Sequence, residues 1–273
     1  MNLSETDLHA GSDRPVALSL LLLSLLASLC WAILALAGSG AGGDAAADAV
    51  AATATGAAAI ADGAIVAVAA VQASALPYGA AQLALVFLMW AGLCTALMLP
   101  LASRAAVLFA RLAGRVAARR ARLCTFLFVL AYLLSWAGFA LLATAAQWVL
   151  DSAAALRHPT VLGLALAAAG IWQWTPAKHA CLEHCRAPLT GILAGWRDGL
   201  PGAFGRGAAH ARQCLGCCWL LMLVLLAAGP DNPAAIAAVG LLVLAEIRLE
   251  SGHWIASAGG LALLALGTRL LFP

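Results

Sequence analysis

Residues 123–148 read LCTFLFVLAYLLSWAGFALLATAAQW, a run of 26 amino acids without a charged side chain. A helix needs about 20 apolar residues to cross the ~30 Å hydrocarbon core of a bilayer. The whole chain shares this character, because 64% of its 273 residues are hydrophobic and only 10% are charged, whereas ordinary soluble domains carry about 25% charged residues. The composition predicts an all-α, polytopic integral membrane helix bundle embedded in the lipid bilayer. It excludes a soluble enzyme, a disordered chain and a nucleic-acid binder.

Long apolar runs recur along the chain, and they predict about seven transmembrane helices, with six as the alternative count. The predicted spans are residues 16–37, 82–101, 123–148, 160–174, 214–229, 234–249 and 254–271. The turn signal GPDNP at residues 229–233 separates the fifth and sixth spans. These two runs therefore form either a spanning hairpin or a re-entrant pair.

Composition divides the chain into three parts. Residues 1–37 hold the N-terminal tail and the first predicted span, and residues 38–81 form a loop rich in alanine and glycine. This loop contains no lysine or arginine, which is typical of a segment on the extracytoplasmic side. Residues 82–273 are the predicted metal-binding membrane-bundle domain.

The distribution of basic residues predicts the orientation, because lysine and arginine collect in the cytoplasmic loops of membrane proteins. In the predicted topology, 13 of the 15 basic residues fall on one side of the membrane. These are Arg14, Arg104, Arg111, Arg115, Arg119, Arg120, Arg122, Lys178, Arg186, Arg197, Arg206, Arg212 and Arg248. The N-terminus is therefore predicted to be cytoplasmic, in a multi-pass protein of the cytoplasmic membrane.

Five of the eight cysteines lie within the 38 residues from 181 to 218. Cys181 and Cys185 are four residues apart and share one face of a helix. Further along, Cys214 and Cys218 continue a four-residue spacing with His210 before them and Met222 after them. All of these positions lie at the predicted cytoplasmic face, where the compartment is reducing. Thiols there are expected to serve as metal ligands rather than to form disulfides.

The second predicted span brings two more sulfur atoms, those of Cys94 and Met98, to the same depth. Thiolates and thioethers are soft donors that select Cu(I), and thiolates also bind zinc. We therefore predict a site for a soft metal ion, such as Cu(I) or zinc, or for reactive thiols. The candidate ligands are Cys181, Cys185, Cys214, Cys217, Cys218, Met222, His184, His210, Cys94 and Met98. Glu246 lies at the inner end of the sixth predicted span, where it is either functional, paired with Arg248 or directed to the interface.

Two motifs resemble those of a known family. The sequence WTPxKxxCxxxCRxP covers residues 174–188, and CLGCCWxxM covers residues 214–222. This pattern resembles the bacterial family of predicted metal-binding integral membrane proteins, which includes the membrane copper chaperone encoded beside a bacterial tyrosinase. The resemblance extends from about residue 82 to the C-terminus and implies copper delivery. In the family a tryptophan precedes a methionine-rich run and a proline, and Trp90, Met98 and Pro100 fit this order.

Together with these features, the resemblance implies a membrane copper chaperone without enzymatic activity. It would hold Cu(I) at a cytoplasmic-side cysteine cluster and deliver it to a partner cuproenzyme such as a copper-dependent oxidase. Two alternatives stay open. Cys214 and Cys217 form a C-x-x-C pair that would suit a membrane thiol–disulfide oxidoreductase, and the chain could also be a subunit of a metal transporter.

Overall fold

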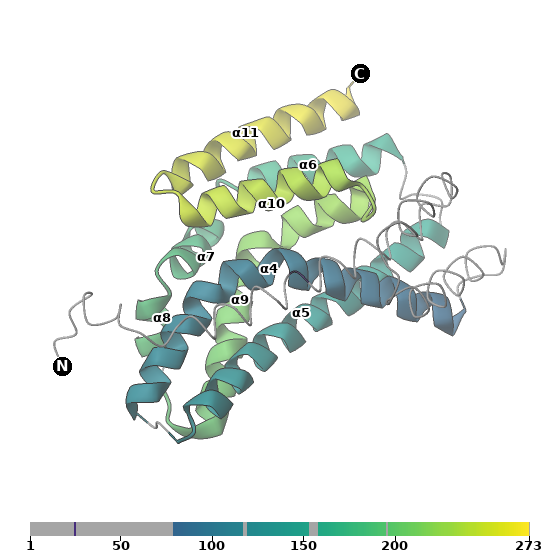
Figure 1. Cartoon of the computed structure of the whole chain (residues 1–273). Helices are drawn as coiled ribbons and strands as arrows, with labels where there is room; N and C mark the ends of the chain where they lie inside the picture. Colours follow the sequence, from purple (N-terminus) through teal and green to yellow (C-terminus); the bar gives the residue numbers. More distant parts are fainter. Residues whose placement is uncertain (1–24, 26–78, 117–118, 153–157, 195, 273) are drawn as a thin grey trace, which may run out of the picture.

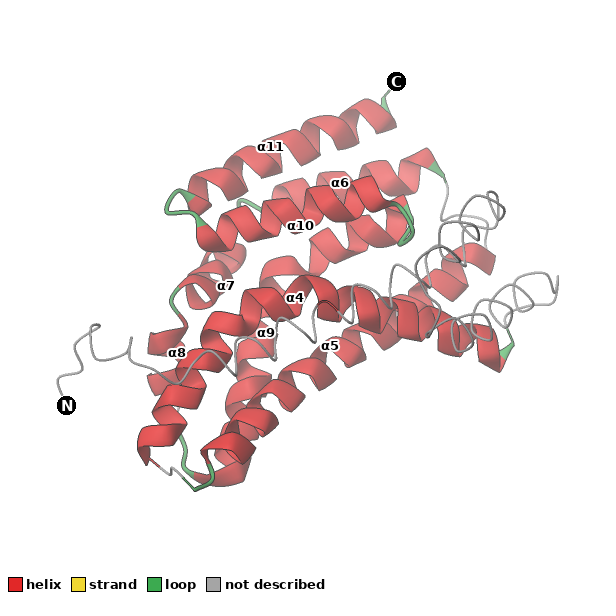
Figure 2. Cartoon of the chain, in the orientation of Figure 1, coloured by secondary structure: helices red, strands yellow, loops and turns green. Residues whose placement is uncertain are grey.

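The computed structural model describes residue 25 and residues 79–116, 119–152, 158–194 and 196–272. Throughout these residues the regular elements are helices and no strand occurs, which confirms the all-α prediction (Figure 2). The helices are α4 (Ala80–Val116), α5 (Ala121–Ser152), α6 (Pro159–Trp172), α7 (Pro176–Arg186), α8 (Pro188–Ala194), α9 (Gly199–Ala228), α10 (Pro233–Arg248) and α11 (Gly252–Leu271). The first predicted span, except for Leu25, and residues 38–78 of the predicted loop lie outside the described residues.

Four helices of the described part are long and apolar enough to cross a membrane. They cover Gln82–Val116, Ala121–Asp151, Gly199–Ala228 and Gly252–Leu271. The apolar runs predicted as spans at 160–174 and 234–249 do form helices, but α6 has 14 residues and α10 has 16. The predicted count of seven spans is therefore not confirmed, while a multi-pass membrane protein fits the four long helices.

Two helices extend well beyond the apolar runs that predicted them. Helix α4 has 37 residues, which corresponds to a length of about 55 Å at 1.5 Å per residue, and α9 begins at Gly199 rather than at residue 214. The added segments carry several arginines among alanines, and both residue types favour helix. Basic stretches that were predicted as loops thus continue the helices past the apolar core.

Helix α9 lies at the centre of the fold and packs against α5, α6, α7 and α10. In Figure 1, α4 and α5 lie on one side of α9, whereas α6, α10 and α11 lie on the other. The short helices α7 and α8 sit near one end of this arrangement (Figure 1). The central position of α9 matters because this helix carries three of the clustered cysteines.

Glycines hold α6 and α11 in backbone contact. A Cβ atom on Gly170 would lie 2.7 Å from the carbonyl oxygen of Gly260, and one on Gly267 would lie 2.7 Å from that of Gly163. The reversed order of these contacts makes the pair antiparallel. Small residues at helix crossings allow this close approach, which is a common basis of helix association in membranes.

Candidate metal centre

Helix α7 is fixed at both ends by hydrogen bonds. Thr175 caps its start, where the hydroxyl oxygen accepts a hydrogen bond from the backbone N–H of Lys178 at 3.2 Å, and Pro176 occupies the first helical turn. At its end, the guanidinium of Arg186 donates to the carbonyl oxygens of Glu246, Leu249 and Glu250. These contacts attach α7 to the segment that joins α10 to α11.

Four cysteines form what we call the thiol cluster: Cys185 of α7 and Cys214, Cys217 and Cys218 of α9. The thiol of Cys185 interacts with the thiols of Cys214 and Cys217. The thiol of Cys218 interacts with the same two partners. Cys185 is 8% exposed and the three cysteines of α9 are at most 2% exposed. Side chains from two separate sequence motifs therefore meet in one buried place.

Cys181 lies beside this cluster, against the backbone of α9. A Cβ atom on Gly216 would stand 2.7 Å from Cys181 Sγ, so the glycine makes room for this thiol. The indole nitrogen of Trp172 donates to the carbonyl oxygen of Gly216 at 3.2 Å. At Gly216, therefore, both the end of α6 and helix α7 contact α9.

The two thiols of α7 carry their protons at neutral pH. Hydrogen bonding to Cys214 and Cys217, followed by burial, raises the pKa of Cys185. Burial, followed by the charge of Cys217, raises the pKa of Cys181. Because thiolates rather than thiols bind metals, an incoming ion would have to displace these protons.

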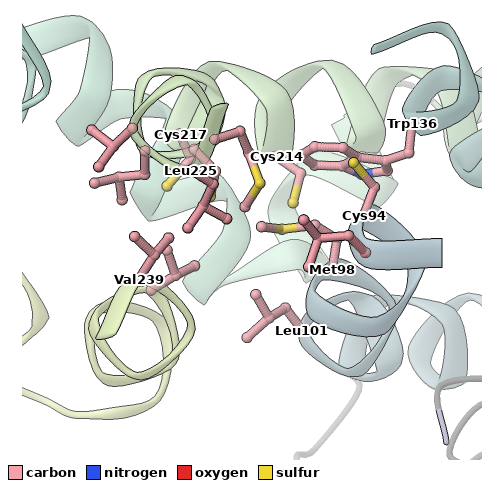
Figure 3. Close-up of a cluster of buried hydrophobic side chains, with 14 of the residues drawn as sticks. Cys94, Met98, Leu101, Trp136, Cys214, Cys217, Leu225 and Val239 are labelled. Atoms are coloured by element: carbon pink, nitrogen blue, oxygen red, sulfur yellow. The ribbon is translucent and has the colours of Figure 1, made fainter. Parts of the chain in front are cut away.

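Helix α4 faces the thiol cluster with the two sulfur-bearing residues that the sequence singled out. Figure 3 shows Met98 beside Cys214 of α9 and Cys94 beside Trp136, and both side chains are at most 1% exposed. The Tyr132 hydroxyl of α5 donates to the carbonyl oxygen of Met98 at 3.1 Å and lies 3.2 Å from Cys214 Sγ. Met222, one of the predicted ligands, is fully buried in the same core.

A buried ion pair, which the sequence did not predict, lies next to the thiol cluster. Lys178 Nζ is 2.7 Å from Glu246 Oε2, and both side chains are 0% exposed. The ammonium also donates to the carbonyl oxygen of Cys217 at 2.9 Å, and Gln173 donates to Glu246 Oε1 at 2.6 Å. From the sequence, Lys178 was predicted to be one of the basic residues in the cytoplasmic loops, and Arg248 was one predicted partner of Glu246. Instead, Arg248 donates to the carbonyl oxygen of Pro100 at 3.1 Å.

The two predicted histidine ligands lie outside the thiol cluster. His184 is exposed, and its Nδ1 is 2.8 Å from the carbonyl oxygen of Ala180. The ring of His210 lies between those of Phe128 and Tyr132, with centroid distances of 6.0 and 5.8 Å. Both histidines border a cavity that is described below.

Within the part of the chain that the structure describes, no three His, Cys, Asp or Glu side chains already stand in a metal-ligating arrangement. The contacts among the thiols nevertheless bring together the donors that a soft metal ion prefers. Small rotations about the cysteine side chains would therefore have to accompany metal binding. The assignment of the ten candidate residues as ligands stays a prediction.

Four membrane-length apolar helices and a buried group of thiols from two helices define a helical, membrane-type protein with a site suited to soft metals. The chain belongs to the PpoB2 copper chaperone family, whose model matches residues 87–270. The family resemblance that the two cysteine motifs predicted is thus confirmed. No curated protein and no solved structure matches the chain.

Proposed function

We propose that this protein holds Cu(I) at the thiol cluster and delivers it to a partner cuproenzyme, such as a copper-dependent oxidase. The observation that carries the proposal is the meeting of Cys185 with Cys214 and Cys217 in a buried place. Thiolates are the side chains that select Cu(I) most strongly, and the family is one of copper chaperones. Copper is here the cargo of the protein.

Loading would exchange thiol protons for copper. The ammonium of Lys178 donates to the main chain of Cys217, and a positive group at this position favours the thiolate form of the cysteines around it. Neighbouring thiols offer more donors than a two- or three-coordinate Cu(I) ion needs, so that one sulfur can leave while another binds. Cys94 and Met98 of α4, which lie in the same buried core as the thiol cluster (Figure 3), would supply further soft donors.

A metal analysis tests this proposal. The protein, purified anaerobically in detergent with its thiols reduced, should retain copper, and the double variant Cys217→Ser/Cys218→Ser should lose at least nine-tenths of it. The matched control is Cys124→Ser, because Cys124 is also a buried cysteine but lies in a different hydrophobic cluster with Phe109 and Phe128. Mass spectrometry measures the metal content. Equal copper in the double variant and in the wild type would contradict the proposal, and preferential retention of zinc would assign the site to zinc.

We also propose that the thiol cluster lies at the cytoplasmic side of the bacterial inner membrane, with the N-terminus cytoplasmic and the C-terminus outside. The excess of basic residues around α7, α8 and the first half of α9 supports this orientation. An alkaline phosphatase fused after residue 273 should therefore be active, whereas a fusion after residue 120, between α4 and α5, should be inactive. The reverse pattern would invert the topology.

A thiol–disulfide oxidoreductase fits the geometry less well. Its C-x-x-C pair would gain reactivity from a helix N-terminus, where the dipole acts only over the first turn. Cys214 and Cys217 instead lie in the middle of α9, which begins at Gly199, and they are 2% and 0% exposed. A disulfide substrate could not reach them without a large opening of the helices.

A further inference from the structure

A cavity of about 280 Å³ opens between α7, α8 and the first half of α9. Its lining includes His184, Gly191, Arg206, His210, Arg212 and Gln213. It is separate from the thiol cluster, since no cysteine borders it among the described residues. His184 and His210, which the sequence predicted as metal ligands, both line this cavity.

The cavity is positively charged. Arg206 donates to the carbonyl oxygen of Gly191 at 2.9 Å, which holds its guanidinium at the wall, and Arg212 is exposed at the rim. Among the described residues no carboxylate lines the cavity. A concave surface with arginines and without acidic groups attracts anions and raises their local concentration.

One wall of the cavity packs against a residue that contacts the thiol cluster. The ring of His210 packs on Tyr132 with a centroid distance of 5.8 Å, and the Tyr132 hydroxyl lies 3.2 Å from Cys214 Sγ. His210 also precedes Cys214 by four residues on α9, so the two side chains lie on one face of the helix. An ion bound in the cavity would therefore be separated from the first thiol by one layer of side chains.

We propose that this cavity is the loading port of the copper chaperone and that it binds Cu(I) as a complex with a small anionic thiol, for example a thiol-containing peptide. This inference rests on the proposed function. Arg212 and Arg206 attract the carboxylates of the carrier, and the imidazoles of His184 and His210 are the first protein ligands of the metal. A phospholipid headgroup would use the arginines but would have no use for two imidazoles or for a position one layer of side chains away from Cys214.

The transfer is a ligand exchange without a change of oxidation state. In the cavity the two imidazoles bind copper while the carrier sulfur still holds it. A bond then forms between copper and the sulfur of a cluster cysteine, and the bonds from copper to the imidazoles and to the carrier sulfur break. The proton of the cysteine thiol passes to the departing carrier thiolate, which leaves as a neutral thiol group. Copper remains Cu(I) throughout.

The test compares the rate of copper transfer from two carriers, the Cu(I) complexes of glutathione and of glutathione diethyl ester. Both carriers bind copper through the same thiol, but in the ester the carboxylates are masked. For Arg212→Gln we expect copper transfer from glutathione to be about fivefold slower than in the wild type. Transfer from the ester and the final copper content should not change. Arg122→Gln is the matched control, because Arg122 is exposed at the start of α5, away from the cavity.

Three outcomes would overturn the port. Equal slowing with both carriers, or equal slowing in Arg122→Gln, would show that the cavity does not recognise the carboxylates. Loss of the Arg212 effect when phosphatidylglycerol replaces phosphatidylcholine in nanodiscs would assign the cavity to lipid headgroups. If the purified wild type retained no copper at all, the proposed function itself would fail, and this failure is distinct from those three outcomes.

Discussion

Replacing Lys178 with methionine should destabilise the protein by about 3–5 kcal/mol, because the change leaves a carboxylate buried without its counter-ion. Lys178 and Glu246 are both 0% exposed and are 2.7 Å apart. Burial lowers the pKa of Lys178, but its interactions with Cys217, Cys218 and Glu246 outweigh burial and hold the pKa above its usual value. The ammonium is therefore charged at neutral pH, and its removal uncovers a full negative charge.

A double variant shows how much of this destabilisation comes from leaving one charge buried without its partner. Lys178→Met/Glu246→Leu removes both charges, and apolar replacement of a buried pair is often close to neutral. We therefore expect the double variant to be much more stable than Lys178→Met alone. Thermal unfolding in detergent measures both variants against the wild type. A loss below about 1 kcal/mol in the single variant, which is typical of exposed ion pairs, would show that water reaches Glu246.

The second large loss of stability is expected for a substitution of Gly207, where α9 crosses α5. A Cβ atom on Gly207 would overlap the backbone carbonyl of Phe128, which cannot rotate away as a side chain could. Overpacking of this kind destabilises by about 1–3 kcal/mol or more. Gly207→Ala should therefore lower the unfolding temperature markedly. It should also weaken copper binding, because the crossing lies two turns of helix before Cys214.

Gly205→Ala is the control for this change, since it makes the same substitution two residues earlier on the same helix. A Cβ atom on Gly205 would meet nothing within 4 Å. Alanine is the better helix former by about 0.8–1.0 kcal/mol, so this variant should be as stable as the wild type or more stable. Equal unfolding temperatures for the two alanine variants would contradict the close contact at Gly207.

Local patterns in the sequence predicted a good part of this structure. The spacing of Cys181 and Cys185 predicted a helix that α7 supplies, and the four-residue interval from His210 to Met222 predicted the continuous face of α9. Each of these features depends on neighbours within one or two helical turns. The family followed from the same two motifs.

Contacts between residues far apart in the sequence could not be predicted from local spacing. Lys178 and Glu246 are 68 positions apart, and no local spacing shows that α7 turns the lysine inward. The role of Tyr132, which touches both Met98 and Cys214, was missed because a lone tyrosine in an apolar run carries no pattern. The lengths of α4 and α9 were underestimated, since an apolar run marks the hydrocarbon part of a helix and not its end.

The attachment of α7 to the far end of α10 limits how small a working version of this protein can be. A chain truncated after α9 would still contain every cysteine of the cluster. However, the Lys178 ammonium would lose its buried partner Glu246, and Arg186 would lose the carbonyl groups to which it donates. The copper-handling unit therefore cannot be excised as the stretch between its two cysteine motifs. A minimal version must include α10 and the turn that follows it, although neither carries a cysteine.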